Sequence, residues 1–324
     1  MGPSAINGIH AALCTVSDFT AHEALFAAAL GWRAGSRRRL SAMDTAARFR
    51  VNAEAEIVQL QARGASSGEV WLACFAGTAP KRLGHPPIRV RGFFAIDLYV
   101  RDLDEAVRRI ELAGFACAGK ATWQVATPTG TVTVRQAKID GPDDVSLVLV
   151  NPREPRYTAA WAHEPAAFAT ELTSVVVGSP DVEASKAFWG EGGLGLPILY
   201  DSVFSQPGMS RMCGIEEDSA FRMAFGVGES TARLEIVGRA NDPHASVPSV
   251  DLAPRQRPGV SLGQSAWIVR VNHLDSALAA ATARGALVIR PAARHSGLVG
   301  PDAEERCAAV LSPEGIWLEL IERA

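Results

Sequence analysis

The sequence has little of what marks a disulfide-bonded or membrane-spanning protein. Its five cysteines are odd in number, scattered and without a C-x-x-C spacing, which argues against a disulfide framework and a thiolate zinc cluster. No apolar run is long enough to cross a bilayer, and the N-terminus lacks the charged start and apolar stretch of a signal peptide. We therefore expect a soluble, cytoplasmic protein without a membrane partner.

An excess of charge of either sign is also missing. The chain has 32 Lys and Arg against 35 Asp and Glu, a formal net charge of -3. Its arginine runs, such as Arg37 to Arg39, are short and local, and they are expected to form a solvated face. No nucleic-acid partner is expected.

Motifs for well-known catalytic chemistries are absent as well. The sequence contains no G-x-S-x-G, H-E-x-x-H or G-x-G-x-x-G arrangement in a suitable context. The stretch "TPTGT" at residues 127–131 has a turn composition without phosphate-loop spacing. Nucleophilic hydrolysis, a zinc protease and dinucleotide binding are therefore not indicated.

What the sequence does contain is a fourfold repeat. Each copy has a short β-like run, a polar cap, an amphipathic helix and a glycine: "LCTVSDFTAHEALFAAALGW", "LYVRDLDEAVRRIELAGF", "VVVGSPDVEASKAFWGEGGLGL" and "IVRVNHLDSALAAATARGA". The side-chain oxygens of Ser17, Asp102, Ser179 and Asn272 can accept hydrogen bonds from the free amides of a first helical turn. Both ends of each helix are therefore marked.

Several β-like segments follow each helix, and the last of them read "EVWLACFAG", "VSLVLVNP", "ARLEIVGR" and "IWLELIER". This order predicts four βαβββ modules. Pro-rich and polar stretches at 79–90, 151–165 and 238–259 separate the modules and are expected to be linkers. The Met- and Gly-rich segment 205–225 is expected either to cover a ligand or to pack in the core.

The pieces "SPDVEASKAFWGEGGLGL" and "SPEGIWLELIE" resemble the vicinal oxygen chelate superfamily, which includes glyoxalases, bleomycin-resistance proteins and extradiol dioxygenases. The resemblance implies an α+β fold in which four βαβββ modules pair into two curved-sheet cups. We expect one pair in residues 1–151, a linker at 152–168 and a second pair in 169–324. A small-molecule substrate and a homodimer are the expected partners.

The last strands of modules three and four each carry a glutamate between large apolar residues. Because side chains alternate along a strand, Leu318 and Leu320 should face the helix while Trp317 and Glu319 face the cup. Glu235 has the same register. The resemblance places a metal-binding carboxylate at these two positions.

The equivalent positions of modules one and two hold Ala73 and Val148, so the N-terminal cup is expected to be degenerate and the C-terminal cup to be the active one. The family also draws a His or Gln from each opening strand, but the corresponding residues are Ala11, Ala95, Ser174 and Ala266. His10 lies one residue away from this register and is expected to be a structural or surface residue.

Other residues of the inferred cup faces complete the candidate site. Arg270 shares a strand face with Ala266 and could clamp a substrate anion or pair with Glu235 or Glu319. Ser174 and Trp317 are the further substrate-binding candidates. Asp97 and Tyr99 should line the N-terminal cup, where a hydrogen-bonding role is favoured over catalysis.

Three functions remain open from these residues. The first is a lyase or isomerase that moves a proton beside an oxygenated carbon, with Glu319 and Glu235 as acid and base or as two ligands of Mg²⁺ or Mn²⁺. The second is a metal-free ligand-binding or resistance protein. The third is an extradiol dioxygenase, which is disfavoured because its iron needs two histidines and one carboxylate.

Overall fold

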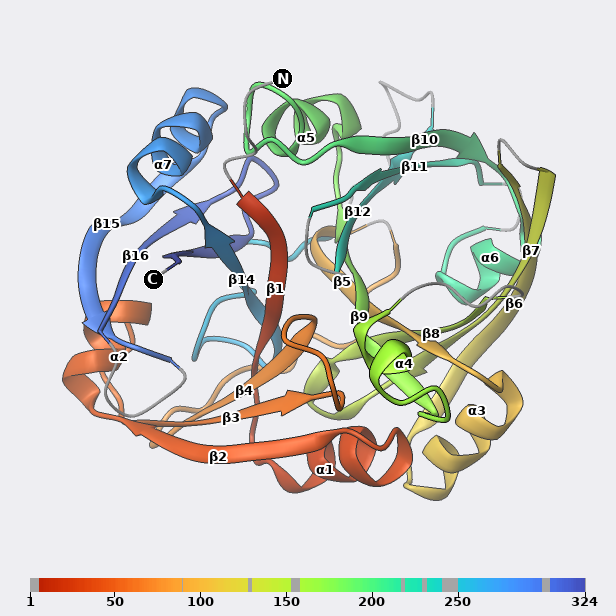
Figure 1. Cartoon of the computed structure of the whole chain (residues 1–324), viewed down its shortest axis with the longest axis horizontal. Coiled ribbons are helices and arrows are strands. Elements are labelled where there is room, and N and C mark those ends of the chain that lie inside the picture. The colour runs from red at the N-terminus through yellow and green to blue at the C-terminus, as the bar shows by residue number, and fades with distance from the viewer. Residues whose placement is uncertain are drawn as a thin grey trace.

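The computed structural model describes residues 6–88, 90–127, 130–152, 158–216, 219–228, 232–240, 250–298 and 304–323, and these form a strand-rich α+β fold (Figure 1). The four βαβββ modules expected from the sequence are present. Module one contains β1 (Ile6–Thr15), α1 (Thr20–Glu23), the π-helix η1 (Ala24–Ala29), β2 (Arg33–Leu40), α2 (Ala42–Phe49), β3 (Ala55–Gln61) and β4 (Glu69–Phe75). Module two contains β5 (Val90–Val100), α3 (Leu103–Leu112), β6 (Ala116–Thr127), β7 (Gly130–Asp140), the 3-10 turn η2 (Pro142–Asp144) and β8 (Ser146–Pro152).

The second half of the chain repeats this order after a short helix, α4 (Ala159–His163). Module three contains β9 (Ala169–Gly178), α5 (Val182–Trp189), β10 (Ile198–Phe204), α6 (Pro207–Met212), β11 (Phe221–Gly226) and β12 (Arg233–Arg239). Module four follows the two-residue strand β13 (Val250–Asp251) and contains β14 (Gly263–Val271), α7 (Leu274–Ala283), β15 (Leu287–Ser296), β16 (Glu304–Leu311) and β17 (Trp317–Glu322). Within the described residues, no helix is both long and apolar enough to cross a membrane.

The helix caps agree with the sequence in one module and differ in the others. Asp102 caps α3 by accepting hydrogen bonds from the backbone of Asp104 and Glu105, both at 3.0 Å. Helix α5 is capped by Asp181 rather than by Ser179, and α7 begins after His273 without a side-chain cap. The hydroxyl of Ser17 does not cap α1, because it hydrogen-bonds to a carboxylate of module two.

The pairing of the modules differs from the one expected from chain order. The first sheet has the order β15-β16-β17-β14-β1-β4-β3-β2, and the path of the second sheet is β10-β11-β12-β9-β5-β8-β7-β6. Modules one and four therefore share one sheet, and modules two and three share the other. The expected halves, residues 1–151 and 169–324, each contribute to both sheets, so the predicted pairing is wrong.

The linkers explain how the chain can pair in this way. The segment between β4 and β5 carries the chain from the first sheet to the second, and the segment between β12 and β14 carries it back. This last segment is anchored on the second sheet, because Gln256 accepts a hydrogen bond from the backbone N–H of Phe93 at 2.8 Å and donates to its carbonyl at 3.0 Å. Repeat patterns in a sequence identify modules, but they do not specify which module supplies the neighbouring edge strand.

One hydrophobic core lies behind both sheets, and each sheet has a further core on its concave face. The shared core contains residues from all four modules. In it the rings of Phe93 and Trp267, which come from different sheets, pack with their centroids 5.2 Å apart. The predicted strand faces are confirmed, since Leu318 and Leu320 belong to the shared core while Trp317 lies in the core of its cup. We call the concave side of modules one and four cup A, and that of modules two and three cup B.

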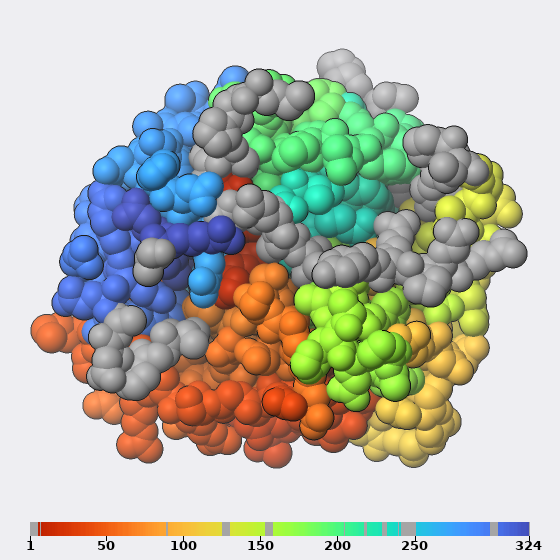
Figure 2. Space-filling view, in the orientation of Figure 1, coloured from red at the N-terminus to blue at the C-terminus, as the bar shows by residue number. Residues whose placement is uncertain are grey.

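The expected linker at 152–168 is in part a folded element of cup B. Residues 153–157 lie outside the described part of the chain, whereas α4 packs beside β9. Figure 2 shows the region of α4, in light green, between the orange strands of module one and the yellow of module two. The indole of Trp161 stacks on the ring of Tyr99 with centroids 6.1 Å apart. This segment therefore closes part of the cup and does more than connect modules.

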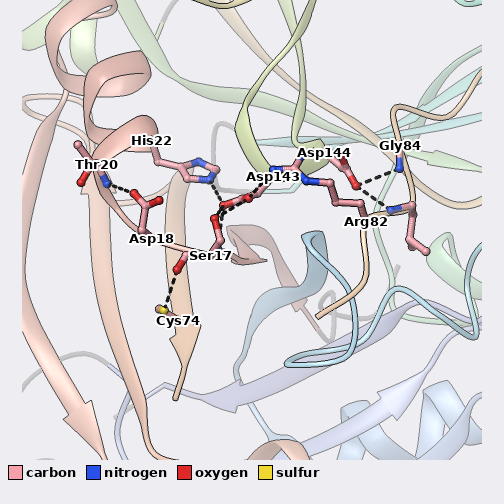
Figure 3. Close-up of polar contacts among 10 residues, drawn as sticks. Ser17, Asp18, Thr20, His22, Cys74, Arg82, Gly84, Asp143 and Asp144 are labelled. Atoms are coloured by element: carbon pink, nitrogen blue, oxygen red, sulfur yellow. Dashed lines mark hydrogen bonds and ion pairs between the residues drawn. The ribbon is translucent and has the colours of Figure 1, made fainter. Parts of the chain in front are cut away.

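A polar cluster centred on Asp143 joins modules one and two (Figure 3). The buried carboxylate of Asp143 accepts hydrogen bonds from the backbone N–H of Ser17 at 2.8 Å and from its hydroxyl at 2.9 Å, and it lies 3.2 Å from Nε2 of His22. Burial alone would raise the pKa of Asp143, but the hydrogen bonds from His22 and Ser17 outweigh it and hold the pKa below its usual value. The carboxylate lies between the serine and the histidine, so this arrangement cannot activate the serine as a nucleophile.

This cluster gives a stability prediction. Asp143→Asn should lower the free energy of unfolding by about 1.5–3 kcal/mol, because it removes hydrogen bonds to a charged acceptor. Asp143→Ala should cost about 1–2 kcal/mol more, since φ at this position is 50° and Asn tolerates the left-handed region better than Ala. Urea denaturation at neutral pH measures both changes.

The pH dependence provides the control. A carboxyl whose pKa is lowered by folding stabilises the protein above the pKa that it has when unfolded, and this contribution is lost as the pH falls through the folded pKa. The advantage of the wild type over Asp143→Asn should therefore shrink below about pH 4. Equal stability of the two proteins at neutral pH would contradict the role assigned to Asp143.

Candidate functional site

The two glutamates of the repeat lie in different cups. Glu319 is on β17 in cup A and Glu235 is on β12 in cup B. They therefore cannot act as the acid and base of one site, nor as two ligands of one ion. This correction follows from the module pairing, which brings module four to module one instead of module three.

In cup A, Glu319 is an ion-pair partner of two arginines. Its carboxylate is 0% exposed and accepts hydrogen bonds from Nε of Arg48 at 3.0 Å, from Arg290, and from the indole N–H of Trp317 at 3.3 Å. Arg48 comes from α2 and also donates to Glu305 at 2.9 Å. Trp317, a predicted substrate-binding residue, thus has a hydrogen-bonding role here.

The remainder of cup A is closely packed. Arg270 is exposed at the rim, and of the described residues it is Arg48 and Arg290, rather than Arg270, that pair with Glu319. His10 is buried at a bulge in β1, with Nε2 3.6 Å from the carboxylate of Glu69. Burial, together with the charge of Arg270, lowers the pKa of His10 to about 3. The apolar side chains of the interior include Leu13, Phe49, Ile57, Trp71, Phe75, Ile268 and Leu298.

Cup B contains the other glutamate and a second carboxyl group beside it. Glu235 on β12 is 7% exposed, and Asp97 on β5 is 3% exposed. The two carboxyl groups are close enough for the charge of Glu235 to act on Asp97. Burial, and next the charge of Glu235, raise the pKa of Asp97 well above its usual value, and Arg233 offsets this only in part. Burial and the neighbouring charge thus both favour the protonated form of Asp97.

Ser174 lies between Asp97 and an arginine. It is the cross-strand neighbour of Asp97 on one side and of Arg233 on the other. Neither Oγ of Ser174 nor Oδ1 of Asp97 has a hydrogen-bond partner in the described structure, although both are buried. The guanidinium of Arg233 donates to the hydroxyl of Tyr99 at 2.8 Å and lies over the ring of Phe225. Ser174, a predicted substrate-binding residue, is thus in the same cup as Glu235.

Aromatic and sulfur-containing side chains surround these polar groups. The segment expected either to cover a ligand or to pack in the core forms α6, which packs on β6 and buries Met209 and Met212 in cup B. Burial, the main influence, raises the pKa of the Cys213 thiol to about 12, so this cysteine is a poor nucleophile. The walls of the cup include Phe94, Tyr99, Trp123, Val148, Trp161, Val176 and Met223.

Sequence reasoning missed two members of this group. Asp97 was placed on a cup face, but in a cup that was expected to lack a carboxylate partner. Arg233 precedes Glu235 by two residues and so shares its strand face, and this spacing was a signal that could have identified it. The same argument was applied to Arg270, which lies in the other sheet.

The donor sets of both cups fit a divalent metal ion poorly. In each cup only one of the four positions that the resemblance assigns to metal ligands is a carboxylate, and in cup A this carboxylate is paired with two guanidinium groups. In the described part of the chain, no group of three or more His, Cys, Asp or Glu side chains is arranged to hold a metal. The family positions are Ala11, Ala73, Ala266 and Glu319 in cup A, and Ala95, Val148, Ser174 and Glu235 in cup B.

The ion pair of cup A gives a prediction about stability. Arg48→Met should lower the free energy of unfolding by about 3–5 kcal/mol, because it leaves the buried carboxylate of Glu319 with one cation fewer. Adding Glu319→Gln to this variant should recover part of the loss. The control is Arg39→Met, whose arginine is 89% exposed, and it should change stability by less than about 0.5 kcal/mol. A loss as small as the control's would contradict the structural role of Arg48.

Metal content gives a second prediction. Because neither cup offers a nitrogen-rich or carboxylate-rich set of ligands, purified protein should retain no stoichiometric iron after dialysis. Added Mg²⁺ or Mn²⁺ should bind weakly and leave Tm unchanged. Elemental analysis that finds one iron per chain would contradict this assignment and restore the dioxygenase hypothesis.

Comparisons with known proteins identify the fold. No protein-family model matches the chain, and no curated protein matches it in sequence. Among solved structures, glyoxalase I from Zea mays is similar with 14% identity and a TM-score of 0.61, covering 97% of this chain and 92% of that one. A Bacillus subtilis protein named provisionally as a dioxygenase has 13% identity and a TM-score of 0.59, covering 98% and 86%.

These structures share the paired βαβββ modules over nearly the whole chain, while their low identity leaves the reaction open. The chain has a fold similar to that of glyoxalase I.

Proposed function

We propose that cup B is a small-molecule active site in which Asp97 and Glu235 transfer a proton next to an oxygenated carbon of the substrate. The observation that carries this proposal is the buried pair of carboxyl groups, beside which Oγ of Ser174 has no hydrogen-bond partner among the described residues. Pairs of carboxyl groups whose pKa values are driven apart are a recurrent basis for acid and base roles. Isomerase and lyase reactions both fit this chemistry.

The two carboxyl groups would have complementary roles. Glu235, ionised, takes a proton from the carbon, so that a C–H bond breaks and an O–H bond forms on the glutamate. Asp97, protonated, gives its proton to the adjacent substrate oxygen as electron density moves onto it. Return of the proton from Glu235 to a different carbon, as a substrate hydroxyl gives its proton back to Asp97, completes an isomerisation and restores both carboxyl groups. Arg233, on the strand of Glu235, limits the build-up of negative charge in the cup.

Cup A takes no part in this proposal. The carboxylate of Glu319 is fully buried and engaged by Arg48 and Arg290, so it is not available to a substrate. We therefore propose that Glu319 supports the fold, in place of the catalytic or metal-binding role expected from the repeat. No reaction step is assigned to a metal ion in either cup, because the residues present do not form a suitable ligand set.

The test uses exchange with solvent deuterium. A panel of small hydroxy- and oxo-compounds with acidic C–H bonds is incubated with the protein in D₂O, and proton NMR reports exchange. Glu235→Gln should slow exchange by about 10²- to 10⁴-fold, since it removes the base, and Asp97→Asn should also slow it. The rate should fall as the pH rises through the raised pKa of Asp97, because the acid is then lost.

Two controls separate catalysis from stability. Glu183→Gln removes an exposed carboxylate and should leave the exchange rate unchanged. Glu319→Gln should reduce stability, while the rate per folded molecule is kept. If compounds bind in cup B but none exchanges, or if Glu235→Gln exchanges as fast as wild type, proton transfer is refuted and a ligand-binding protein becomes the better description.

A further inference from the structure

Three polar groups at adjacent positions of cup B have unused hydrogen-bonding capacity. Oγ of Ser174 and Oδ1 of Asp97 are buried without a partner in the described structure. Arg233 donates through Nε to the carbonyl of Thr173 at 3.4 Å and through Nη2 to Tyr99, which leaves Nη1 without an acceptor among the described residues. Ser174 is the cross-strand neighbour of both other residues, so the three groups form one row across β5, β9 and β12.

The guanidinium in this row lacks a strong counter-ion. Of the described residues, none places a carboxylate within ion-pair distance of Arg233. The guanidinium contacts a phenol hydroxyl, a backbone carbonyl and two aromatic rings. It is only half-buried, so a ligand can reach it. A charge-assisted hydrogen bond to an oxyanion is the strongest interaction that such a guanidinium can make.

The chemistry of the row selects the ligand group. The hydroxyl of Ser174 and Nη1 of Arg233 are donors on neighbouring strands, which lie about 4.8 Å apart. A ligand carboxylate has two oxygens, so it can accept from both donors at once. An ammonium group would be repelled by Arg233, and an uncharged amide would accept a weaker hydrogen bond from the guanidinium than a carboxylate would.

The surroundings of the row select the body of the ligand. Tyr99 contributes its hydroxyl to the row, and its ring stacks on Trp161. Trp123 and Phe94 belong to the same buried cluster. Flat, apolar groups pack well between aromatic rings, where offset and edge contacts add to the burial of area.

We propose that cup B binds an aromatic carboxylate, with its carboxylate group on Arg233 and Ser174 and its ring among the aromatic side chains beside Tyr99. The proposal rests on the proposed function in one respect, since both place the ligand in cup B. It adds the substrate class, and it assigns Arg233 as the residue that selects for the anion.

Benzoate is the probe, and benzamide, which has a similar shape but no charge, is its matched competitor. Binding is measured by tryptophan fluorescence at constant ionic strength, because Trp123 and Trp161 line the cup. Wild type should bind benzoate saturably and at least about tenfold more tightly than benzamide. Arg233→Gln should weaken benzoate binding by about 10- to 100-fold and leave benzamide binding unchanged.

Control variants keep the result interpretable. Arg63→Gln makes the same change in an exposed turn of the other sheet and should bind both probes as wild type does. Arg233→Lys keeps the charge and should give an intermediate affinity for benzoate, which a loss of folding would not produce. Circular dichroism confirms that each variant is folded.

Three results would overturn the proposal: equal binding of benzoate and benzamide, unchanged benzoate binding in Arg233→Gln, or no saturable binding of benzoate at all. These outcomes are distinct from failure of the proposed reaction. Anion-selective binding without deuterium exchange would refute proton transfer and support the carboxylate site. Deuterium exchange that occurs only with uncharged compounds would support proton transfer and refute the carboxylate site.

Discussion

Two antiparallel strand ladders hold the molecule together. β1 pairs with β14 in the first sheet and β5 pairs with β9 in the second, and each ladder joins two modules that could not close a cup alone. The first ladder links residues that lie far apart in the chain. For example, the hydroxyl of Thr15 donates a hydrogen bond to the hydroxyl of Ser265, 250 residues later. The position of every cup residue depends on this choice of partners, since it decides which side chains face one another.

The same repeat position has two electrostatic outcomes. In cup A the carboxylate of Glu319 is neutralised by guanidinium groups from two other elements, and these ion pairs are buried in the protein interior. In cup B burial and the charge of Glu235 raise the pKa of a second carboxyl group, that of Asp97. A buried charge with a cation is a fixed feature, whereas a buried carboxyl pair can exchange a proton.

Local sequence signals predicted the modules, the strand faces and one of the helix caps. Asp102 was identified as a cap because the interaction is confined to one helical turn. Leu318 and Leu320 were placed correctly because alternation along a strand is also local. The partners of Glu319 and Asp97 could not be predicted in this way. They are reached only through the pairing of distant modules, which depends on linker paths and on packing between sheets.

The pairing of the first module with the last has a consequence for synthesis on the ribosome. Modules two and three emerge one after the other and can close cup B while the chain is still growing. β1, made first, must wait for β14, which follows after some 250 residues, the separation of Thr15 and Ser265. At bacterial or eukaryotic elongation rates this delay is about 10–50 s, during which an apolar strand edge is available to chaperones or to neighbouring nascent chains.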